Sequence, residues 1–486
     1  MLNYSVAELR KTIIGLAAMA LCLGFASCSS DDDAPSYSNA AVSNSELMTI
    51  LKAKGYQFDE NGKMLLDDKA NSTTSLDLSG TKVDTAALKE LSVFPNLKEL
   101  NLSSNGYGET FDFSVLPAQI TGIDLTNNDI YNYDNLVKVT VEENGDETVE
   151  NVHNITKLYL PEEAKYNIAQ LVRFYRQNKS AIDGGTMDVE MQNANGSLEK
   201  YNTLREIPDA TLRAYLNQET TFSGLFDGEK IDLSKKLSNA QKINNIYVNP
   251  YFFQDASLNI DDVTSLEGLQ YIVENPYWEG TTIYIAPNNT LALPKMQVGS
   301  SVTLLQLKNL DASKGLDITK ATGLHYIDLM AISGITNVDL SNNPIFGQRG
   351  TEAEQDAMTG SSLYVVDCED VEEIKLPKAS NPLSLNHLDF ELLPQLKSFD
   401  ISNIQMICSL CIGDLPESYN LVYPNLTVFN SSTNRTDFAC SQKTMGLSST
   451  VDFVKKYYSA TTDKKLGYSR ILKSKKNNPG MWLTIK

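Results

Sequence analysis

Four cysteines after residue 360 carry the clearest spacing for covalent or metal chemistry. Cys408 and Cys411 form a Cys-x-x-Cys pair, and Cys368 and Cys440 lie on either side of it. Such a set can close a disulfide, remain as buried thiols, hold zinc or act as a redox dithiol. In an exported chain we predict a disulfide among Cys408, Cys411 and Cys440, with unpaired buried thiols as the main alternative. Cys368 lies at a core-facing position in one of the short sequence repeats of the chain, which favours a buried thiol there.

Other catalytic patterns are missing from the sequence. The three histidines belong to no His-Glu-x-x-His pair, and there is no Gly-x-Ser-x-Gly, phosphate-binding loop or dinucleotide fingerprint. "FDENGK" (58–63) invites a calcium loop, but counting from Asp59 places Lys63 and Met64 where a ligand and a glycine are needed. We predict a polar turn there, no metal, no cofactor and no enzymatic activity. An exported hydrolase is the weakest of the functional hypotheses for this chain.

Two Asn-Pro-Tyr stretches each add a second large aromatic residue. They supply Tyr251 with Phe252 and Tyr277 with Trp278. Exposed rings of this kind stack on the faces of sugars, so the four residues could form a glycan-binding platform. The alternative is that they seal the hydrophobic core at the start of a repeat array. Both interpretations stay open at this stage.

The N-terminus has the three parts of an export signal. Arg10 and Lys11 precede an uncharged stretch over 12–25, which is too short to span a membrane. Ala26-Ser27-Cys28 then resembles the lipobox of bacterial lipoproteins, although Phe25 departs from the usual aliphatic residue. The resemblance implies cleavage after residue 27 and a lipid on Cys28. Cleavage without lipidation, giving a soluble exported protein, is the alternative.

Three aspartates follow the cysteine almost at once. "SSDDD" (29–33) resembles the acidic tag that sends Bacteroidetes-type lipoproteins to the outer face of the outer membrane. Residues 34–45 are uncharged and rich in Ser, Asn, Ala and Pro, so we predict a disordered spacer there, within an acidic and polar tether over 28–45. We therefore expect a protein on the outer membrane that faces the cell exterior and is held only by its lipid anchor.

Composition limits the partners of the chain. Its 486 residues carry a formal net charge of −20 and 42% hydrophobic residues. The hydrophobic content is enough for a large core, and so acidic a protein is a poor nucleic-acid binder. Basic residues are concentrated in 454–486, which we expect to be a solvated tail. The predicted partners are a protein or a glycan at the cell surface.

Short repeats run along the chain. The pattern L-x-x-L-x-L-x-x-N recurs in "LKELNLSSNGY" (97–107), "ITGIDLTNNDI" (120–130) and "ITNVDLSNNPI" (335–345), and "TSLDLSGTKV" begins similarly at Thr74. This resembles the leucine-rich-repeat family. Ile285, Leu307 and Leu329 lie 22 residues apart, which predicts one coil per interval. The repeat asparagine is expected to bond backbone groups of neighbouring coils. "ITKLYLP" (155–161), "LALP" (291–294) and "VEEIKLP" (371–377) look like a second strand on the opposite side.

Helical patterns bracket two sets of these repeats. Amphipathic segments at 45–53 and 209–216 precede the two sets, and segments at 166–179 and 450–458 follow them. Such segments suit caps that cover the end coils of a repeat array. We predict a β-rich α/β solenoid of leucine-rich repeats in two capped modules, 46–190 and 200–486, joined near 183–197.

The resemblance implies binding through a continuous concave face. The outward strand positions there include Tyr284, Gln306, Tyr326 and Asp328, which alternate with inward core residues. The sequence therefore predicts a cell-surface lipoprotein that binds a protein ligand through this face. Glycan capture for nutrient uptake, through the aromatic cluster at 251–252 and 277–278, is the alternative.

Overall fold

The computed structural model describes residues 35–485, except 143–146, 251–257, 349–360, 378–381, 414, 417–419, 427–436, 459–468 and 473–482. The fold is β-rich α/β, with most strands parallel to their neighbours. Within these ranges, no helix is long and apolar enough to cross a membrane.

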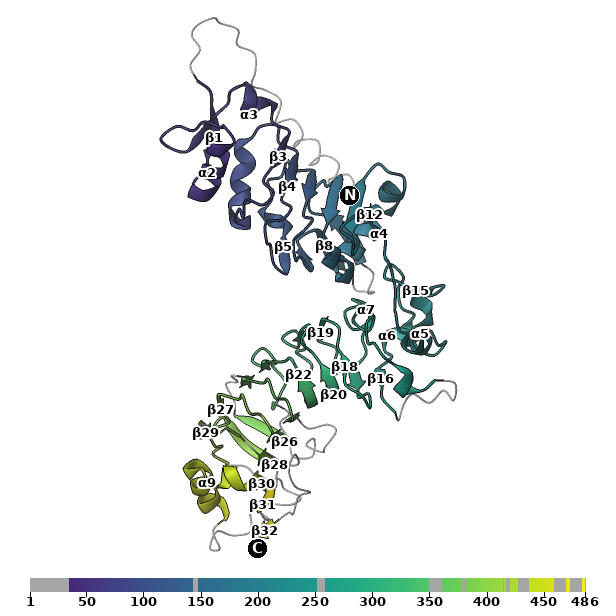
Figure 1. The fold of residues 1–486 in the computed structure, drawn as a ribbon, viewed down its shortest axis with the longest axis vertical. Helices are drawn as coiled ribbons and strands as arrows, with labels where there is room; N and C mark the ends of the chain where they lie inside the picture. The colour runs from purple at the N-terminus through teal and green to yellow at the C-terminus, as the bar shows by residue number, and fades with distance from the viewer. Residues whose placement is uncertain are drawn as a thin grey trace, which may run out of the picture.

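Two hydrophobic cores divide the molecule. The first joins buried residues between Val42 and Tyr201, and the second joins those between Ile168 and Phe453. Figure 1 shows the elements of the first core above those of the second, with helices α4 (Gln170–Asp183) and α7 (Gln270–Val273) between them. Helix α4 serves both cores, because Leu171 and Phe174 pack into the first and Val172 packs into the second.

A six-stranded sheet forms one wall of the first core. Leu76, Leu100, Ile123 and Leu158 are in register across its parallel strands and are all buried. Such in-register apolar residues form one continuous inner face. The order is β12 (Leu198–Lys200), β11 (Asp188–Gln192), β10 (Lys157–Leu160), β6 (Gly122–Asp124), β4 (Glu99–Asn101) and β3 (Ser75–Asp77).

The second core lies behind an eleven-stranded sheet. Ile285, Leu307 and Leu329 are in register across three of its strands, so the predicted 22-residue interval is confirmed. Its main path runs through β16 (Ile246–Val248), β17 (Thr282–Ile285), β20 (Leu304–Asp311), β22 (Tyr326–Ser333), β24 (Ser362–Val366), β26 (Leu383–Glu391), β28 (Ile404–Gly413), β30 (Asp437–Ser441), β31 (Ser469–Leu472) and β32 (Leu483–Ile485), with β18 (Leu291–Ala292) beside β20.

Smaller sheets accompany the two large ones. A four-stranded sheet orders β23 (Asn337–Asp339), β25 (Glu373–Lys375), β27 (Ser398–Asp400) and β29 (Asn420–Val422). The stretch "VEEIKLP" contains β25 and thus lies in a second sheet, as predicted. The stretches "ITKLYLP" and "LALP" instead contain β10 and β18, which pair into the large sheets, so the prediction was wrong for them. The remaining sheets are β1 (Tyr37–Ala41) with β2 (Lys63–Leu65), β5 (Thr110–Asp112) with β7 (Asn132–Asp134), β8 (Val137–Val141) with β9 (Glu147–Asn151), β19 (Met296–Gln297) with β21 (Leu316–Asp317), and β13 (Leu204–Arg205) with β15 (Lys230–Asp232) and β14 (Phe226–Asp227).

Buried asparagines tie successive turns together, as the repeat pattern predicted. The side-chain amide of Asn128 donates to the carbonyls of Leu102 and Leu125, at 3.1 and 2.9 Å. Its Oδ1 accepts the backbone N–H of Asn105 at 3.0 Å. One amide therefore satisfies buried backbone groups of two turns, which would otherwise cost free energy.

Aspartates end many strands in a second recurring turn. Asp77, at the end of β3, accepts the backbone N–H of Ser79 at 2.9 Å, and this bond holds the pKa of Asp77 below its usual value. The same turn occurs at Asp112, Asp124, Asp311, Asp317, Asp339 and Asp400. Each carboxylate thus fixes the direction in which the chain leaves its strand.

The predicted cap helices are present at both ends of each core. They are α2 (Ser45–Ala53), α4, α5 (Ala210–Leu216) and α9 (Ser448–Tyr458). Three further short helices are α3 (Asp68–Ser72), α6 (Asn239–Lys242) and α8 (Gln442–Met445). Asp209 caps the start of α5, because its Oδ1 accepts the backbone N–H of Leu212 at 2.8 Å. The 3₁₀ helices are η1 (Thr85–Val93), η2 (Phe113–Val115), η3 (Glu162–Tyr166), η4 (Ser223–Leu225) and η5 (Ile260–Asp262).

Three stretches differ from the sequence-based expectations. The predicted tether is ordered in part, because β1 pairs with β2, Ser38 Oγ accepts the N–H of Met64, and Val42 enters the first core. The predicted join at 183–197 instead contains β11, which pairs into the first sheet and turns back into β12. The basic tail contributes β31 and β32 to the large sheet. In each case backbone pairing overrides a polar composition.

Candidate functional site

Four of the predicted binding residues lie together on the outward side of the eleven-stranded sheet. Tyr284, Gln306 and Asp328 are in register on β17, β20 and β22, and Tyr326 lies two residues before Asp328. The row continues through Tyr364, Asp389 and Cys411 on β24, β26 and β28. Five strand spacings separate its ends, a length of about 24 Å. We call this row, with its outward neighbours Tyr326, His387, Lys308 and Glu391, the sheet face.

Aromatic rings in the sheet face contact one another. The Tyr326 and Tyr364 ring centroids are 5.7 Å apart, and the Tyr364 ring stacks on His387 at 5.6 Å. Burial and the Asp328 carboxylate raise the pKa of Tyr326 to about 12, so its phenol stays neutral and can donate. These contacts restrict the side chains before any ligand arrives.

Asp328 is the most buried charged group of the sheet face, with 6% of its surface exposed. Its Oδ2 accepts from Gln306 Nε2 at 3.1 Å and forms an ion pair with Lys308 Nζ at 3.0 Å. Its Oδ1 has no hydrogen-bond donor among the residues that the structure describes. A buried carboxylate oxygen in this state is costly, and a donor brought by a ligand would relieve that cost.

The far end of the sheet face gathers ligand atoms of Asp389, Glu391 and Cys411 within 4.8 Å of one another. Burial and the two carboxylates raise the pKa of the Cys411 thiol, which donates to Glu391 Oε1 at 3.1 Å. Together these groups form a short acidic patch at this end of the sheet face.

No disulfide joins the cysteines in the described part of the chain, so the predicted bridge among Cys408, Cys411 and Cys440 is wrong. Cys408 and Cys411 share strand β28, where residues three apart point to opposite faces. Cys440 is buried on β30 beside Ile412 rather than beside Cys411. Cys368 is fully buried, which confirms its predicted core position.

The aromatic platform is not formed at Trp278, whose surface is only 6% exposed. Its indole N–H donates to the carbonyl of Asn244 at 2.7 Å, and the ring folds back over Gly280. Tyr277 is half-buried and makes contacts with the first core. The exposed-ring interpretation is therefore wrong for this pair, and the alternative, in which the rings seal the core, is confirmed for Trp278, which packs into the second core. Tyr251 and Phe252 lie outside the described residues.

Two reciprocal tyrosine–glutamate contacts join the cores. Tyr277, beside the second core, donates its phenol to Glu147 Oε2 on β9 at 2.6 Å. Tyr131, beside the first core, contacts both Glu274 oxygens, at 2.8 and 2.7 Å. Arg173 of α4 pairs with Glu147, and the guanidinium carbon of Arg173 lies 5.7 Å from the centre of the Tyr277 ring. Each core thus contributes one donor and one acceptor, and together they fix how the cores meet.

Glu274 sits at the end of α7 against the first core. Burial raises the pKa of its carboxyl to about 7, although the bonds from Tyr131 and from the backbone N–H of Gln297 act in the opposite direction. Lys295 reinforces the contact by pairing with Glu109 of the first core at 2.6 Å. The junction therefore contains a carboxyl group whose charge changes near neutral pH.

Sequence reasoning missed half of the sheet face and all of the junction. Tyr364 and Asp389 were not predicted, because residues 346–362 interrupt the 22-residue interval. The residue that pairs with Leu329 is therefore Val365, which lies farther along the chain than the interval predicts. The alternation in "SLYVV" could have revealed the strand. Glu147 and Glu274 gave no local signal, because their partners lie more than 100 residues away in sequence.

Replacing Glu274 with glutamine should change how stability depends on pH. A carboxyl whose pKa rises on folding favours the folded state below the unfolded value of about 4.5, and this contribution is lost as pH rises to about 7. We expect the free energy of unfolding of the wild type, measured with urea, to fall between pH 5 and pH 8. The fall should be about 2–3 kcal/mol larger than that of Glu274→Gln. Identical pH profiles for the two proteins would refute the assignment.

Gly280 should be intolerant of even one methyl group. A Cβ there would lie 2.4 Å from the Trp278 ring and 2.5 Å from the carbonyl oxygen of Asn244. We expect Gly280→Ala to lower the free energy of unfolding by roughly 1–3 kcal/mol and to shift the tryptophan fluorescence. Gly108→Ala is the matched control, since a Cβ there meets nothing within 4 Å. Equal stability of the two variants would show that Trp278 does not pack this way.

Comparison with known proteins adds no relative. No protein-family model matches the chain, and no curated protein matches it either.

Proposed function

We propose that this protein is a lipid-anchored binding protein of the cell surface, and that its sheet face takes a basic segment of a protein ligand. The observation that carries the proposal is the row from Tyr284 to Cys411, in register over six strands. Its length of about 24 Å matches some seven residues of extended chain, which is longer than a small molecule needs.

The chemistry of the row favours cationic groups in the ligand. Asp328, Asp389 and Glu391 offer carboxylate oxygens, and one oxygen of Asp328 has no donor within the described residues. Neighbouring tyrosine rings can receive lysine or arginine side chains by cation–π contact. The formal net charge of −20 would attract such a ligand and speed its encounter with the protein.

We further propose a solenoid of leucine-rich repeats as the architecture that presents this face. The parallel strand order, the 22-residue register and the asparagines that bond two turns all support it. In such a solenoid the sheet face would be concave and continuous. A rigid sheet would hold the polar row in place and so reduce the entropy lost when a ligand binds.

The glycan platform is not proposed as a second function. Trp278 is buried and donates to Asn244, and Tyr277 is held by Glu147. These partners hold both rings in place, so the pair does not form an exposed platform on the surface.

Display at the surface rests on the sequence at Cys28, which lies outside the described residues. We expect the wild-type protein to sediment with membranes and to be cut by protease added to intact cells. Cys28→Ser should release it from the membrane fraction, because no lipid would be attached. Membrane retention of the Cys28→Ser protein would contradict a lipid anchor.

The sheet face can be tested with peptides of defined charge. We expect purified full-length protein to bind lysine- and arginine-rich 15-residue peptides, with affinity that falls as salt rises. Asp389→Asn combined with Tyr364→Ala should weaken binding by about tenfold or more, a loss of at least about 1.4 kcal/mol.

Glu46→Gln is the control for charge, since it removes one carboxylate from the exposed side of α2 in the first core. Its binding should equal that of the wild type. Preference for acidic or neutral peptides, or full binding by the Asp389/Tyr364 variant, would exclude the sheet face as a site for basic segments.

A further inference from the structure

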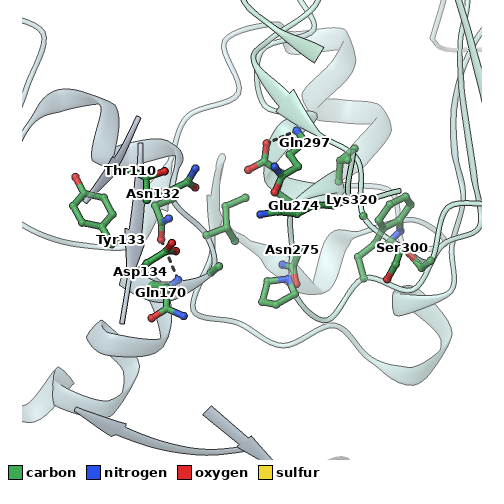
Figure 2. Close-up of a pocket in the computed structure, with 18 of the residues that line it drawn as sticks. Thr110, Asn132, Tyr133, Asp134, Gln170, Glu274, Asn275, Gln297, Ser300 and Lys320 are labelled. Atoms are coloured by element: carbon green, nitrogen blue, oxygen red, sulfur yellow. Dashed lines mark hydrogen bonds between the residues drawn. The ribbon is translucent and has the colours of Figure 1, made fainter. Parts of the chain in front are cut away.

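A polar cleft of about 620 Å³ lies between the two cores, away from the sheet face. One wall comes from β5, β7 and the start of α4, and the other comes from α7 and the segments at 275–279 and 297–301. Figure 2 shows the labelled side chains of the first core, including Asn132 and Asp134, opposite Glu274, Asn275 and Lys320 of the second. Its volume is in the range of small-ligand sites, which often lie between domains.

One buried group in this cleft has an unused hydrogen-bond donor. Asn275 is only 3% exposed. Its Oδ1 accepts the backbone N–H of Tyr277 at 3.0 Å, which fixes the side chain. Its Nδ2 is buried and has no acceptor among the described residues. Since a buried amide N–H is costly to leave unpaired, this nitrogen indicates a ligand acceptor in the cleft.

The opposite wall offers matching groups on one strand. Asn132 and Asp134 are two residues apart on β7, so their side chains lie on the same face while Tyr133 turns into the first core. Neither side chain has a hydrogen bond to any described residue, although both line the cleft. The amide can donate to or accept from one hydroxyl group, and the carboxylate can accept from the adjacent hydroxyl group.

The rest of the lining restricts the class of ligand. Ser300, Ser301 and Lys320 add polar groups, and Val273 and Trp278 add an apolar wall. The carboxylates of Asp134 and Glu279 disfavour anions, and the many amides disfavour a purely apolar molecule. A ligand with several hydroxyl groups and one apolar face fits best.

We propose that this cleft binds a neutral saccharide of one or two rings. Asn132 and Asp134 hold vicinal hydroxyls on one side, and Asn275 Nδ2 donates to a ring or hydroxyl oxygen on the other. The apolar wall meets the C–H face of the sugar. The Tyr131–Glu274 contact links the two walls, and the Asn167 side chain, which donates to the carbonyl of Tyr131 at 3.2 Å, holds Tyr131 in place on its own wall.

This site is independent of the protein ligand proposed for the sheet face, because none of its lining residues belongs to that face. It also differs from an exposed aromatic platform, since Trp278 here stays folded against Gly280 and contributes only to the wall. A sugar that contacts both cores would stabilise their junction, because a ligand shifts the equilibrium toward the form that binds it.

Saturation-transfer NMR with purified full-length protein, in a detergent without a sugar headgroup, tests the proposal. The probes are glucose, galactose, N-acetylglucosamine, maltose and lactose, with glycine and glutamate as charged alternatives. We expect transfer to at least one saccharide and none to the amino acids. Asn132→Ala and Asp134→Ala should each weaken saccharide binding about tenfold, as expected for a lost hydrogen bond of about 1.4 kcal/mol.

Asp129→Ala is the matched control, since Asp129 is an exposed residue of the same region outside the cleft. Its saccharide binding should be unchanged, and thermal melts should confirm that all three variants fold. Binding that persists in Asn132→Ala and Asp134→Ala, or an absence of saccharide binding at tens of millimolar, overturns the proposal. Binding of glycine or glutamate in place of the sugars would also overturn it, in favour of a zwitterionic ligand.

Discussion

The structure depends on satisfying the backbone groups of turns that pack against one another. Short parallel strands leave N–H and C=O groups where the chain bends, and those between two stacked turns cannot reach water. The side-chain amides of Asn105 and Asn128 meet this need by bonding carbonyls of two turns each, and aspartates such as Asp77 fix the exit from a strand. With the turns fixed, leucine and isoleucine side chains fall into register behind the sheets, and polar side chains fall into register in front of them.

The sheet face follows from this register. Because inward and outward residues alternate, a core of Leu307 and Leu329 places Gln306 and Asp328 side by side on the other surface. The packing that stabilises the protein thus also sets the spacing of the proposed binding groups. This coupling explains how a carboxylate such as Asp328 can be held nearly buried, with Lys308 and Gln306 as its only described partners.

The junction between the cores uses a different kind of interaction. Buried phenol–carboxylate bonds, supported by Arg173 and Lys295, join two separate hydrophobic clusters that share helix α4. Polar contacts of this kind specify one geometry, because each donor must meet its acceptor at hydrogen-bond distance. The same geometry leaves a cleft whose walls carry amide nitrogens with no partner among the described residues, so the proposed saccharide site is a consequence of how the two cores meet.

The sequence by itself determined the features that depend on neighbouring residues. Repeat spacing predicted the register across β17, β20 and β22, helical periodicity predicted α2, α4, α5 and α9, and the repeat asparagines predicted the bonds between turns. Alternation along strands placed Tyr284, Gln306, Tyr326 and Asp328 on one face. Tertiary structure alone decided the rest: that Cys408 and Cys411 point apart, that Trp278 folds over Gly280, and that Glu147 and Glu274 meet tyrosines of the other core. The reason is physical, since local patterns fix the direction in which a side chain points, whereas its partner is set by chain segments that meet only after folding.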